Sequence, residues 1–153
     1  MIDELKAIEI LKNELGFSDS SIKKLKKFHN YLLEYNKRYN LISKNTEKSI
    51  WFRHILDSAQ IIKFIEAQKI DNIVDFGSGA GFPGLIIAFY NENTRFHVKL
   101  YEKSPVKRAF LRNIKEKLDI RNLDIANDVY GEEILADIIV CRAFKKLDEI
   151  LRI

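Results

Sequence analysis

The chain has 153 residues, of which 46% are hydrophobic and 31% charged, and its formal net charge is +4. This length and composition predict a single folded domain with its own hydrophobic core. The lone cysteine excludes a disulfide framework and a multi-cysteine zinc site, and no run approaches the ~20 apolar residues of a membrane span, so we expect a cytoplasmic protein with no membrane partner.

Residues 1–70 are predicted to form a helical subdomain. Apolar residues recur at helical spacing in residues 3–15, in a second segment that begins near residues 18–20, and in residues 46–68. Gly16 is a typical end for the first helix, and Ser18 and Thr46 can cap the other two. Arg53 and Asp57 lie four residues apart in the third helix, where they can form an ion pair.

Residues 71–153 alternate between strand and helix. Strands are predicted at residues 72–76, 96–101, 123–126 and 137–141, and helices at residues 83–90, at 104–118 and from about residue 145. Ser104 can cap the second of these helices, with Pro105 at its first position. Short connections between alternating elements predict a Rossmann-like α/β fold, with a parallel sheet and helices on both faces.

The stretch VDFGSGAGFPG, residues 74–84, lies between a predicted strand and a predicted helix. Its glycines allow the backbone to turn sharply and to approach a ligand closely, and they also satisfy the GxGxxG dinucleotide pattern. Asp75 precedes them, however, and its carboxylate would repel a pyrophosphate and attract an ammonium group. We therefore favour S-adenosylmethionine as the ligand; alternatively, Asp75 binds the N–H groups of its own turn.

Three further residues are candidates for the same site. Glu102 ends the second strand about twenty residues after the glycines, where an acid can accept hydrogen bonds from ribose hydroxyls. Arg142 follows the fourth strand and can bind a base or a carboxylate. His54 belongs to the polar cluster RHILDS, residues 53–58, which suggests that this helix borders the cleft.

Four segments together resemble one family: NLIS (residues 40–43), RHILDS (53–58), VDFGSGAGFPG (74–84) and CRAF (141–144). Their order and spacing are similar to those of the bacterial 16S ribosomal RNA (guanine-N7)-methyltransferases, also called glucose-inhibited division protein B. The resemblance implies a class I methyltransferase that uses S-adenosylmethionine to methylate N7 of one guanine in the 530 loop of 16S rRNA. Its partner would be 16S rRNA or the small ribosomal subunit, and we expect a monomer.

The residue patterns and the resemblance together give the candidate site residues. The cofactor-binding candidates are Asp75, Gly77, Gly79, Phe82, Glu102, Tyr130, Gly131 and Arg142. Tyr130 and Gly131 stand where the family has a small residue followed by Glu, and Asp128, Glu132 or Glu133 are the alternatives there. The RNA-binding candidates are Lys23, Lys24, Lys27, Arg53, Lys103, Lys107 and Arg108. The lysines of the second helix can equally be a solvated surface.

Guanine N7 already has a lone pair in the plane of its ring, so methyl transfer to it needs no strong general base. We therefore assign no catalytic acid, base or metal, and regard Arg142 and His54 as candidates for positioning the substrate. Family members continue through further strands after CRAF, so the C-terminal strands of the fold are expected to be missing. The fourth strand would then be an exposed apolar edge. The alternative function is a non-catalytic, truncated RNA- or ribosome-binding remnant.

Overall fold

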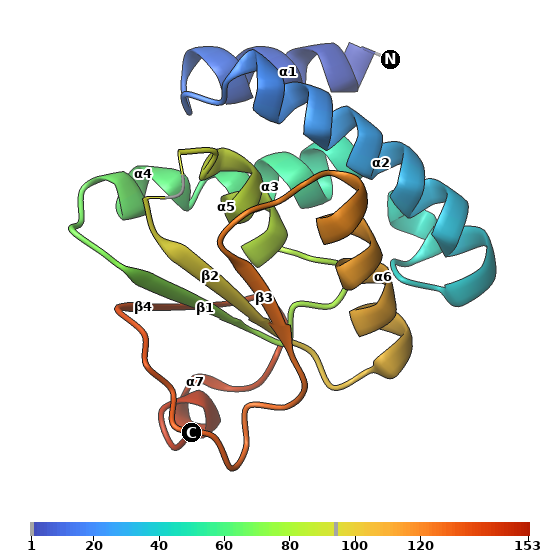
Figure 1. Ribbon diagram of the computed structural model, residues 1–153. Helices are drawn as coiled ribbons and strands as arrows, with labels where there is room; N and C mark the ends of the chain where they lie inside the picture. The colour runs from blue at the N-terminus through green and yellow to red at the C-terminus, as the bar shows by residue number, and fades with distance from the viewer. Residues whose placement is uncertain (1, 94) are drawn as a thin grey trace.

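The computed structural model describes residues 2–93 and 95–153, and within them one parallel sheet has the strand order β3-β2-β1-β4. Its strands are β1 (Asn72–Phe76), β2 (His97–Tyr101), β3 (Leu123–Ala126) and β4 (Ile138–Cys141). Most helices cover one face of the sheet, whereas the short C-terminal helix and the loop after β3 lie on the other (Figure 1). This arrangement confirms the predicted parallel α/β fold, and the predicted strand bounds agree to within one residue.

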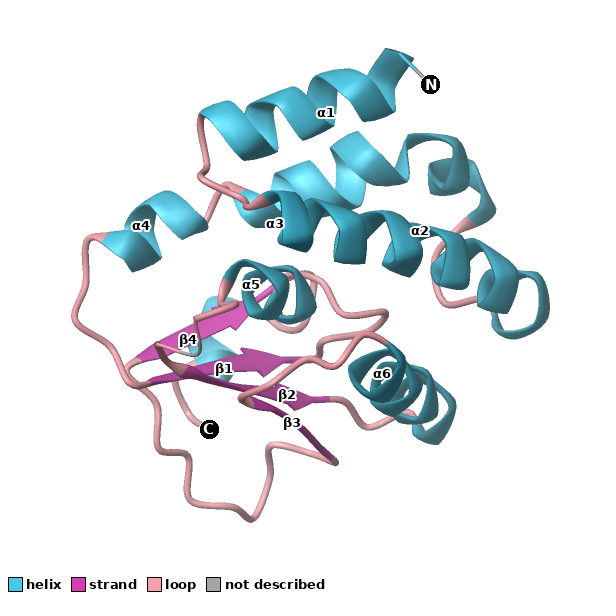
Figure 2. Ribbon diagram, turned by 45° about the horizontal axis from the view of Figure 1, so that its top comes forward, coloured by secondary structure: helices cyan, strands magenta, loops and turns pink. Residues whose placement is uncertain are grey.

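Two long helices precede the sheet, α1 (Ile2–Asn13) and α2 (Asp19–Tyr39). The Ser18 hydroxyl accepts a hydrogen bond from the Ser21 N–H at 3.0 Å, so Ser18 caps α2 as predicted. The fully buried Phe28 of α2 lies 5.6 Å from the ring of Phe89 and 6.2 Å from that of Phe110. These contacts place α2 directly on the helices of the sheet, in one common hydrophobic core (Figure 2).

The single helix predicted over residues 46–68 is wrong. The structure has a 3₁₀ helix η1 (Lys44–Ser49), a π-helical turn η2 (Trp51–Leu56), and two short helices, α3 (Asp57–Ala59) and α4 (Ile62–Glu66). Three residues of the π turn, Trp51, Ile55 and Leu56, are buried, so this turn packs against the hydrophobic core. Thr46 is not a cap, because its hydroxyl donates to the Ser43 carbonyl at 2.9 Å.

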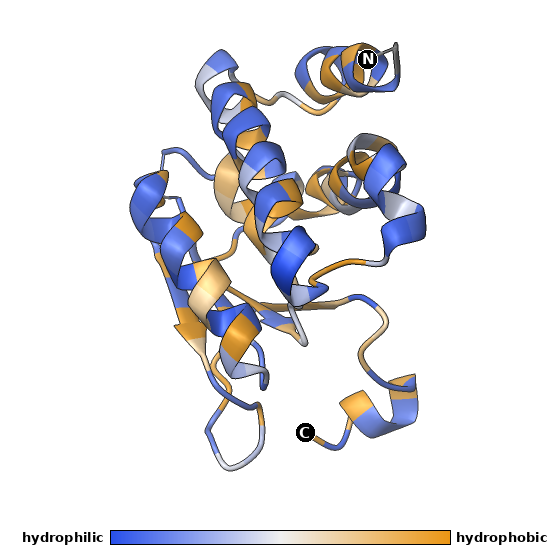
Figure 3. Ribbon diagram, turned by 90° about the vertical axis from the view of Figure 1, so that its right-hand side faces the viewer, coloured by the Kyte–Doolittle hydropathy of each residue, from blue (hydrophilic) through white to orange (hydrophobic). Residues whose placement is uncertain are grey.

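Two helices connect the strands on the covered face, α5 (Gly84–Tyr90) and α6 (Pro105–Lys117), and α7 (Leu147–Ile150) follows β4. The Ser104 hydroxyl accepts from the Lys107 N–H and Pro105 is the first residue of α6, as predicted. In α2 and α6, hydrophobic and hydrophilic residues alternate along the helix (Figure 3). Their apolar sides therefore face the core and leave the charged sides to solvent.

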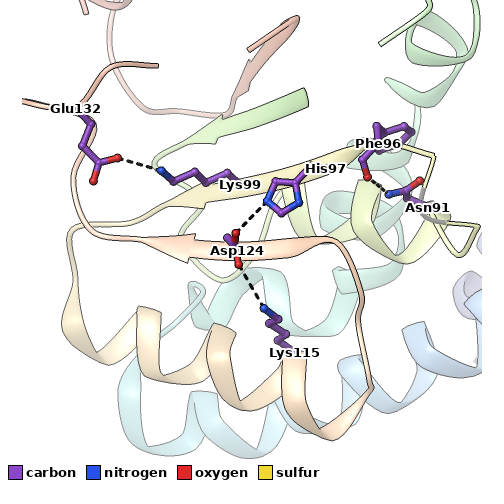
Figure 4. A network of polar contacts seen from close by, with 7 residues as sticks. All are labelled: Asn91, Phe96, His97, Lys99, Lys115, Asp124 and Glu132. Atoms are coloured by element: carbon purple, nitrogen blue, oxygen red, sulfur yellow. Dashed lines mark hydrogen bonds and ion pairs between the residues drawn. The ribbon is translucent and has the colours of Figure 1, made fainter. Parts of the chain in front are cut away.

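The other face of the sheet carries a polar network beside the edge strand β3 (Figure 4). Lys99 of β2 lies 3.0 Å from Glu132 in the loop after β3, and His97 lies 3.1 Å from Asp124 of β3. Lys115 of α6 reaches the same aspartate at 3.5 Å. These contacts tie the loop after β3 to the sheet and so help to position the residues that directly follow β3.

At the opposite edge of the sheet, β4 pairs with β1 alone among the described strands. Ile139 on this strand is 49% exposed. The prediction that β4 would be an apolar edge strand is therefore confirmed.

Candidate functional site

A cleft of about 580 Å³ lies at the carboxyl ends of the strands. In parallel α/β sheets this is the end at which ligands bind, and the volume is within the range of small-molecule pockets. Each strand contributes to it through the segment that follows: Gly77 after β1, Glu102 after β2, Asn127 after β3 and Phe144 after β4. The remaining lining residues are Tyr101, Lys103, Lys107, Asp128, Val129, Ala143, Lys145, Lys146 and Glu149.

The glycine turn after β1 borders this cleft through Gly77. Gly77, Gly79 and Gly81 have φ of +73°, +59° and +107°, a region that side chains disfavour. The N–H groups of Gly77 and Ser78 both donate to the Tyr101 carbonyl, at 2.9 and 3.0 Å. The turn is therefore anchored across β1 and β2, as a rigid edge of the cleft.

Glu102 braces the turn from the end of β2. Its Oε2 accepts from the Gly79 N–H at 2.7 Å, and its Oε1 accepts from the Ser104 N–H at 2.8 Å. A carboxylate oxygen has two lone pairs, so each of these oxygens can accept one more hydrogen bond. Glu102 lines the cleft, as expected of a ribose-binding acid, and at the same time fixes the shape of the glycine turn.

Asp75 lies beneath the turn and has no exposed surface. Its Oδ2 accepts from the Gly84 N–H at 2.9 Å, whereas Oδ1 has no hydrogen-bond partner among the residues that the structure describes. Burial raises the pKa of this carboxyl to about 7, and the Gly84 N–H only partly opposes that effect. This geometry corresponds to the second interpretation of Asp75, a residue bonded to its own turn.

Phe82 also lies away from the cleft. It is 6% exposed, and its ring stacks on the His54 imidazole at 5.0 Å and contacts the Phe28 ring at 5.7 Å. The turn is thereby held from below by the N-terminal helices. A contact between Phe82 and a cofactor remains a prediction.

The segment after β3 enters the cleft earlier than the resemblance implies. Asn127, Asp128 and Val129 line it, whereas Tyr130 is 56% exposed. Arg108 donates from Nη1 to Asn127 Oδ1 at 2.8 Å and to the carbonyls of Glu102 and Lys103. Asn127 was missed at the sequence level, although its position directly after a strand was a usable signal.

Arg142 joins the end of β4 to the N-terminal helices. Its Nη1 donates to His54 Nδ1 at 3.1 Å, and its Nη2 donates to the Arg53 carbonyl at 2.8 Å. Its Nε lies 3.6 Å from Asp57 Oδ2, so Asp57 pairs with Arg142 rather than with the predicted Arg53. Each of the three guanidinium nitrogens thus contacts a residue of the segment 53–57, which is far from Arg142 in the sequence.

His54 is neutral in this arrangement. Burial, and then the charge of Arg142, lower its pKa from 6.5 to about 4. With Nδ1 accepting from Arg142, Nε2 carries the proton and donates to the Thr46 hydroxyl at 2.9 Å. Arg142, His54 and Thr46 therefore form one chain of hydrogen bonds.

Replacing Arg142 with lysine is expected to destabilise the protein by about 1 to 3 kcal/mol, because an ammonium cannot reproduce three differently directed contacts of a guanidinium. Urea unfolding measures this loss. Arg121→Lys is the control, because Arg121 is exposed and lies 3.8 Å from Asp119. We call the contacts of Arg142 with His54, Arg53 and Asp57 the Arg142 clamp. An Arg142→Lys protein as stable as the control would show that this clamp contributes little to the stability of the fold.

The candidate RNA-binding residues lie in different places. Lys103 and Lys107 line the cleft, and Arg53 is exposed next to the Arg142 clamp. Lys24, in contrast, donates to the Asp119 carbonyl in the loop that precedes β3, at the opposite end of the sheet. Lys23 and Lys27 are exposed on the same helix as Lys24. The predicted set is therefore not one continuous surface.

Two kinds of site are absent from the described residues, 2–93 and 95–153. No helix in this part of the chain is long and apolar enough to cross a membrane. No group of three or more His, Cys, Asp or Glu side chains in it could hold a metal ion.

Comparison with known sequences gave consistent results. Residues 21–153 match the family model described as rRNA small subunit methyltransferase G. A protein of that name from Rickettsia bellii is 39% identical over 130 residues, which are 84% of this chain and 65% of the relative. One from Bartonella henselae is 35% identical over 158 residues, covering 98% of this chain and 71% of the relative. The chain thus spans about 65% of the length of relatives such as the Rickettsia protein.

Comparison with solved structures supports the fold. The SAH-bound methyltransferase PaMTH1 of Podospora anserina superposes with a TM-score of 0.58 at 17% identity, over 93% of this chain and 57% of that chain. A protein-L-isoaspartate O-methyltransferase gives a TM-score of 0.55 at 19% identity, over 90% and 47% of the two chains. At these identities the likeness concerns the fold alone, and that fold is the one predicted.

Proposed function

The chain belongs to the rRNA small subunit methyltransferase G family, and on this basis we propose that it transfers a methyl group from S-adenosylmethionine to N7 of a guanine in the 530 loop of 16S rRNA. The observation that carries the proposal is the cleft at the carboxyl ends of the strands. Gly77 and Glu102 both line this cleft, and the Glu102 carboxylate accepts a hydrogen bond from the backbone of Gly79 in the same turn.

The residues of the cleft fit this cofactor. Gly77 has no side chain of its own and lines the cleft beside the ring of Phe144, which covers part of its backbone. Glu102 keeps one free lone pair on each oxygen for ribose hydroxyls. Asn127 and Asp128 lie beyond Glu102 and offer acceptors for the amino group of an adenine.

S-adenosylmethionine, when bound, supplies a methyl group on a sulfonium, which is a good leaving group. The guanine N7 lone pair is available without deprotonation, so the protein has only to hold the two reactants in line and close together. We assign positioning to Arg142 and His54, whose hydrogen bonds fix the segment after β4 beside the cleft. No residue is assigned as nucleophile, acid or base.

The proposed partner is 16S rRNA or the small ribosomal subunit, bound by a monomer in the cytoplasm. Lys103 and Lys107 border the cleft, and we assign to them the binding of RNA phosphates next to the target base. N7 faces the deep groove of an RNA helix, where side chains cannot read it. The target guanine should therefore lie in an open loop or in an incompletely assembled subunit.

Two experiments test the proposal in sequence. Calorimetry should detect binding of S-adenosylmethionine and S-adenosylhomocysteine but not of NAD; if neither methyl donor nor product binds, the protein is not an active methyltransferase. Primer extension after N7-specific cleavage, on 16S rRNA from a deletion strain, should then show loss of one modified guanine in the 530 loop. An unchanged pattern would contradict the proposed substrate, and complementation with the gene is the control.

A further inference from the structure

Phe144 forms the wall of the cleft that faces the glycine turn. A Cβ added to Gly77 would lie 3.1 Å from Phe144 Cγ and closer still to Cδ2, so the ring occupies the space directly over that glycine. The ring is held from behind by Phe76, at 6.0 Å between centroids. Phe144 was part of the CRAF segment in the sequence, yet no role was assigned to it.

The backbone before Phe144 has a conformation that side chains rarely adopt. Ala143 has φ of +50°, in the left-handed region. A non-glycine residue in this region costs free energy and is found most often where the surrounding structure requires it. Here the turn follows Arg142, which is clamped by His54, and it directs the next side chain back over Gly77. The clamp and the left-handed residue together set the position of the ring.

The strand order indicates which part of the cofactor meets Phe144. Glu102 follows β2, which lies between β3 on one side and β1 on the other. A ribose bound at Glu102 would have its adenine on the β3 side, near the acceptors of Asn127 and Asp128. The sulfonium leaves the ribose from its other end and would therefore lie on the side of β1 and β4, where Gly77 and Phe144 meet.

We propose that the ring of Phe144 binds the sulfonium of S-adenosylmethionine by a cation–π contact and thereby distinguishes the charged donor from the neutral product. This inference rests on the proposed function. A cation within about 6 Å of an aromatic ring is attracted to the negative face of the ring, and more strongly where water is excluded. The neighbouring Lys145 lies 6.0 Å from the same ring, but its Nζ is 3.6 Å from Glu149, which compensates its charge.

The test compares S-adenosylmethionine with S-adenosylhomocysteine, which has a neutral sulfur. Calorimetry should show that Phe144→Leu weakens the binding of S-adenosylmethionine roughly 3- to 30-fold and changes that of S-adenosylhomocysteine by less than about twofold. Phe144→Tyr keeps an aromatic face and should retain the affinities for both ligands. Phe144→Met, a second non-aromatic variant of similar size, should reproduce the effect of leucine.

The ratio of the affinities for S-adenosylmethionine and S-adenosylhomocysteine is measured within each variant. Partial unfolding lowers both affinities by the same factor and so leaves their ratio unchanged. Equal weakening of both ligands in Phe144→Leu and Phe144→Met would show that the ring only packs, and would overturn the inference while leaving the proposed function intact. Unchanged binding of both ligands would also overturn it. A wild-type protein that binds neither ligand would contradict the proposed function itself, and this inference with it.

Discussion

Replacing Gly84 with alanine is expected to destabilise the protein by about 2 to 4 kcal/mol. A Cβ at this position would lie 2.6 Å from Asp75 Oδ2, 2.7 Å from Asp75 Cβ and closer still to Leu100 Cδ2. Both neighbours are fully buried on the covered face of the sheet, so neither can turn toward solvent. The first turn of α5 must move instead, and the hydrogen bond from the Gly84 N–H to Asp75 is strained or lost.

Urea unfolding measures this loss, and Gly131→Ala is the matched control. Gly131 has φ of +82°, but an added Cβ there meets no atom within 4 Å among the described residues. The control variant therefore has backbone strain without a steric clash and should lose only about 1 kcal/mol. If Gly84→Ala is no less stable than Gly131→Ala, the close packing of the turn against β1 and β2 is refuted.

The same substitution should also affect the ligand. The turn from Gly77 to Gly84 is held at its far end by Asp75 and at its middle by Glu102. Displacement of Gly84 would shift Gly79 relative to Glu102 and spoil both the anchoring bond and the shape of the cleft. We therefore expect Gly84→Ala to weaken S-adenosylmethionine binding as well, in the fraction of the protein that remains folded.

Local signals explain why some elements could be predicted from the sequence. The strands are short apolar runs bounded by polar residues, and α6 begins at Ser104 and Pro105, whose chemistry is sufficient to start a helix. The local signal in the region between Thr46 and Gln68 was misleading, because Thr46 does not cap a helix there. Its π turn packs against α1, which is distant in the sequence, and no local pattern signals that contact.

The candidate site was predictable only in part, for a similar reason. Spacing within one segment located the glycine turn and Glu102, which the fold then brings together. The contact of Arg142 with His54 joins residues 88 positions apart, and no local pattern contains that information. The burial of Asp75 could not be predicted either. Whether a side chain on a strand is buried depends on which face of the sheet the helices cover, and the strand sequence does not contain that information.

Burial of Asp75 should make stability depend on pH. The pKa of its carboxyl is about 7 in the folded protein against 3.8 as the model value, so the folded state binds the extra proton between these values. Stability should therefore fall as pH rises from about 4 to 7, by an amount on the order of 4 kcal/mol, and should change no further above that range. Asp75→Asn removes this dependence while its amide oxygen can still accept from the Gly84 N–H.

His54 acts in the opposite direction in an overlapping range. Its pKa is about 4 in the folded protein and 6.5 as the model value, so the unfolded state binds the extra proton. That difference makes stability rise with pH from about 4 to 6.5. The stability of the wild-type protein as a function of pH is the sum of the Asp75 and His54 contributions, and it should vary less than either contribution alone. In Asp75→Asn only the His54 contribution remains, so stability should rise with pH.

Urea unfolding from about pH 5 to about pH 8 tests this prediction. Asp75→Asn should be more stable than the wild-type protein throughout this range, by a margin that grows up to about pH 7 and then stays constant. Asp71→Asn is the control, because Asp71 is exposed just before the same strand, and its profile should follow the wild type. A profile of Asp75→Asn that runs parallel to the wild type would show that the carboxyl is not buried as the structure has it.

The same variant separates the two interpretations of Asp75. If the acid serves its own turn, its amide analogue keeps the bond to Gly84, the turn keeps its shape, and the affinity for S-adenosylmethionine is unchanged. If the carboxylate attracts the ammonium group of the ligand, loss of its charge weakens that affinity even though the protein is more stable at neutral pH. Since the carboxyl has no exposed surface and is bonded to Gly84, we expect unchanged affinity together with higher stability. The opposite combination would require the turn to open when the ligand binds.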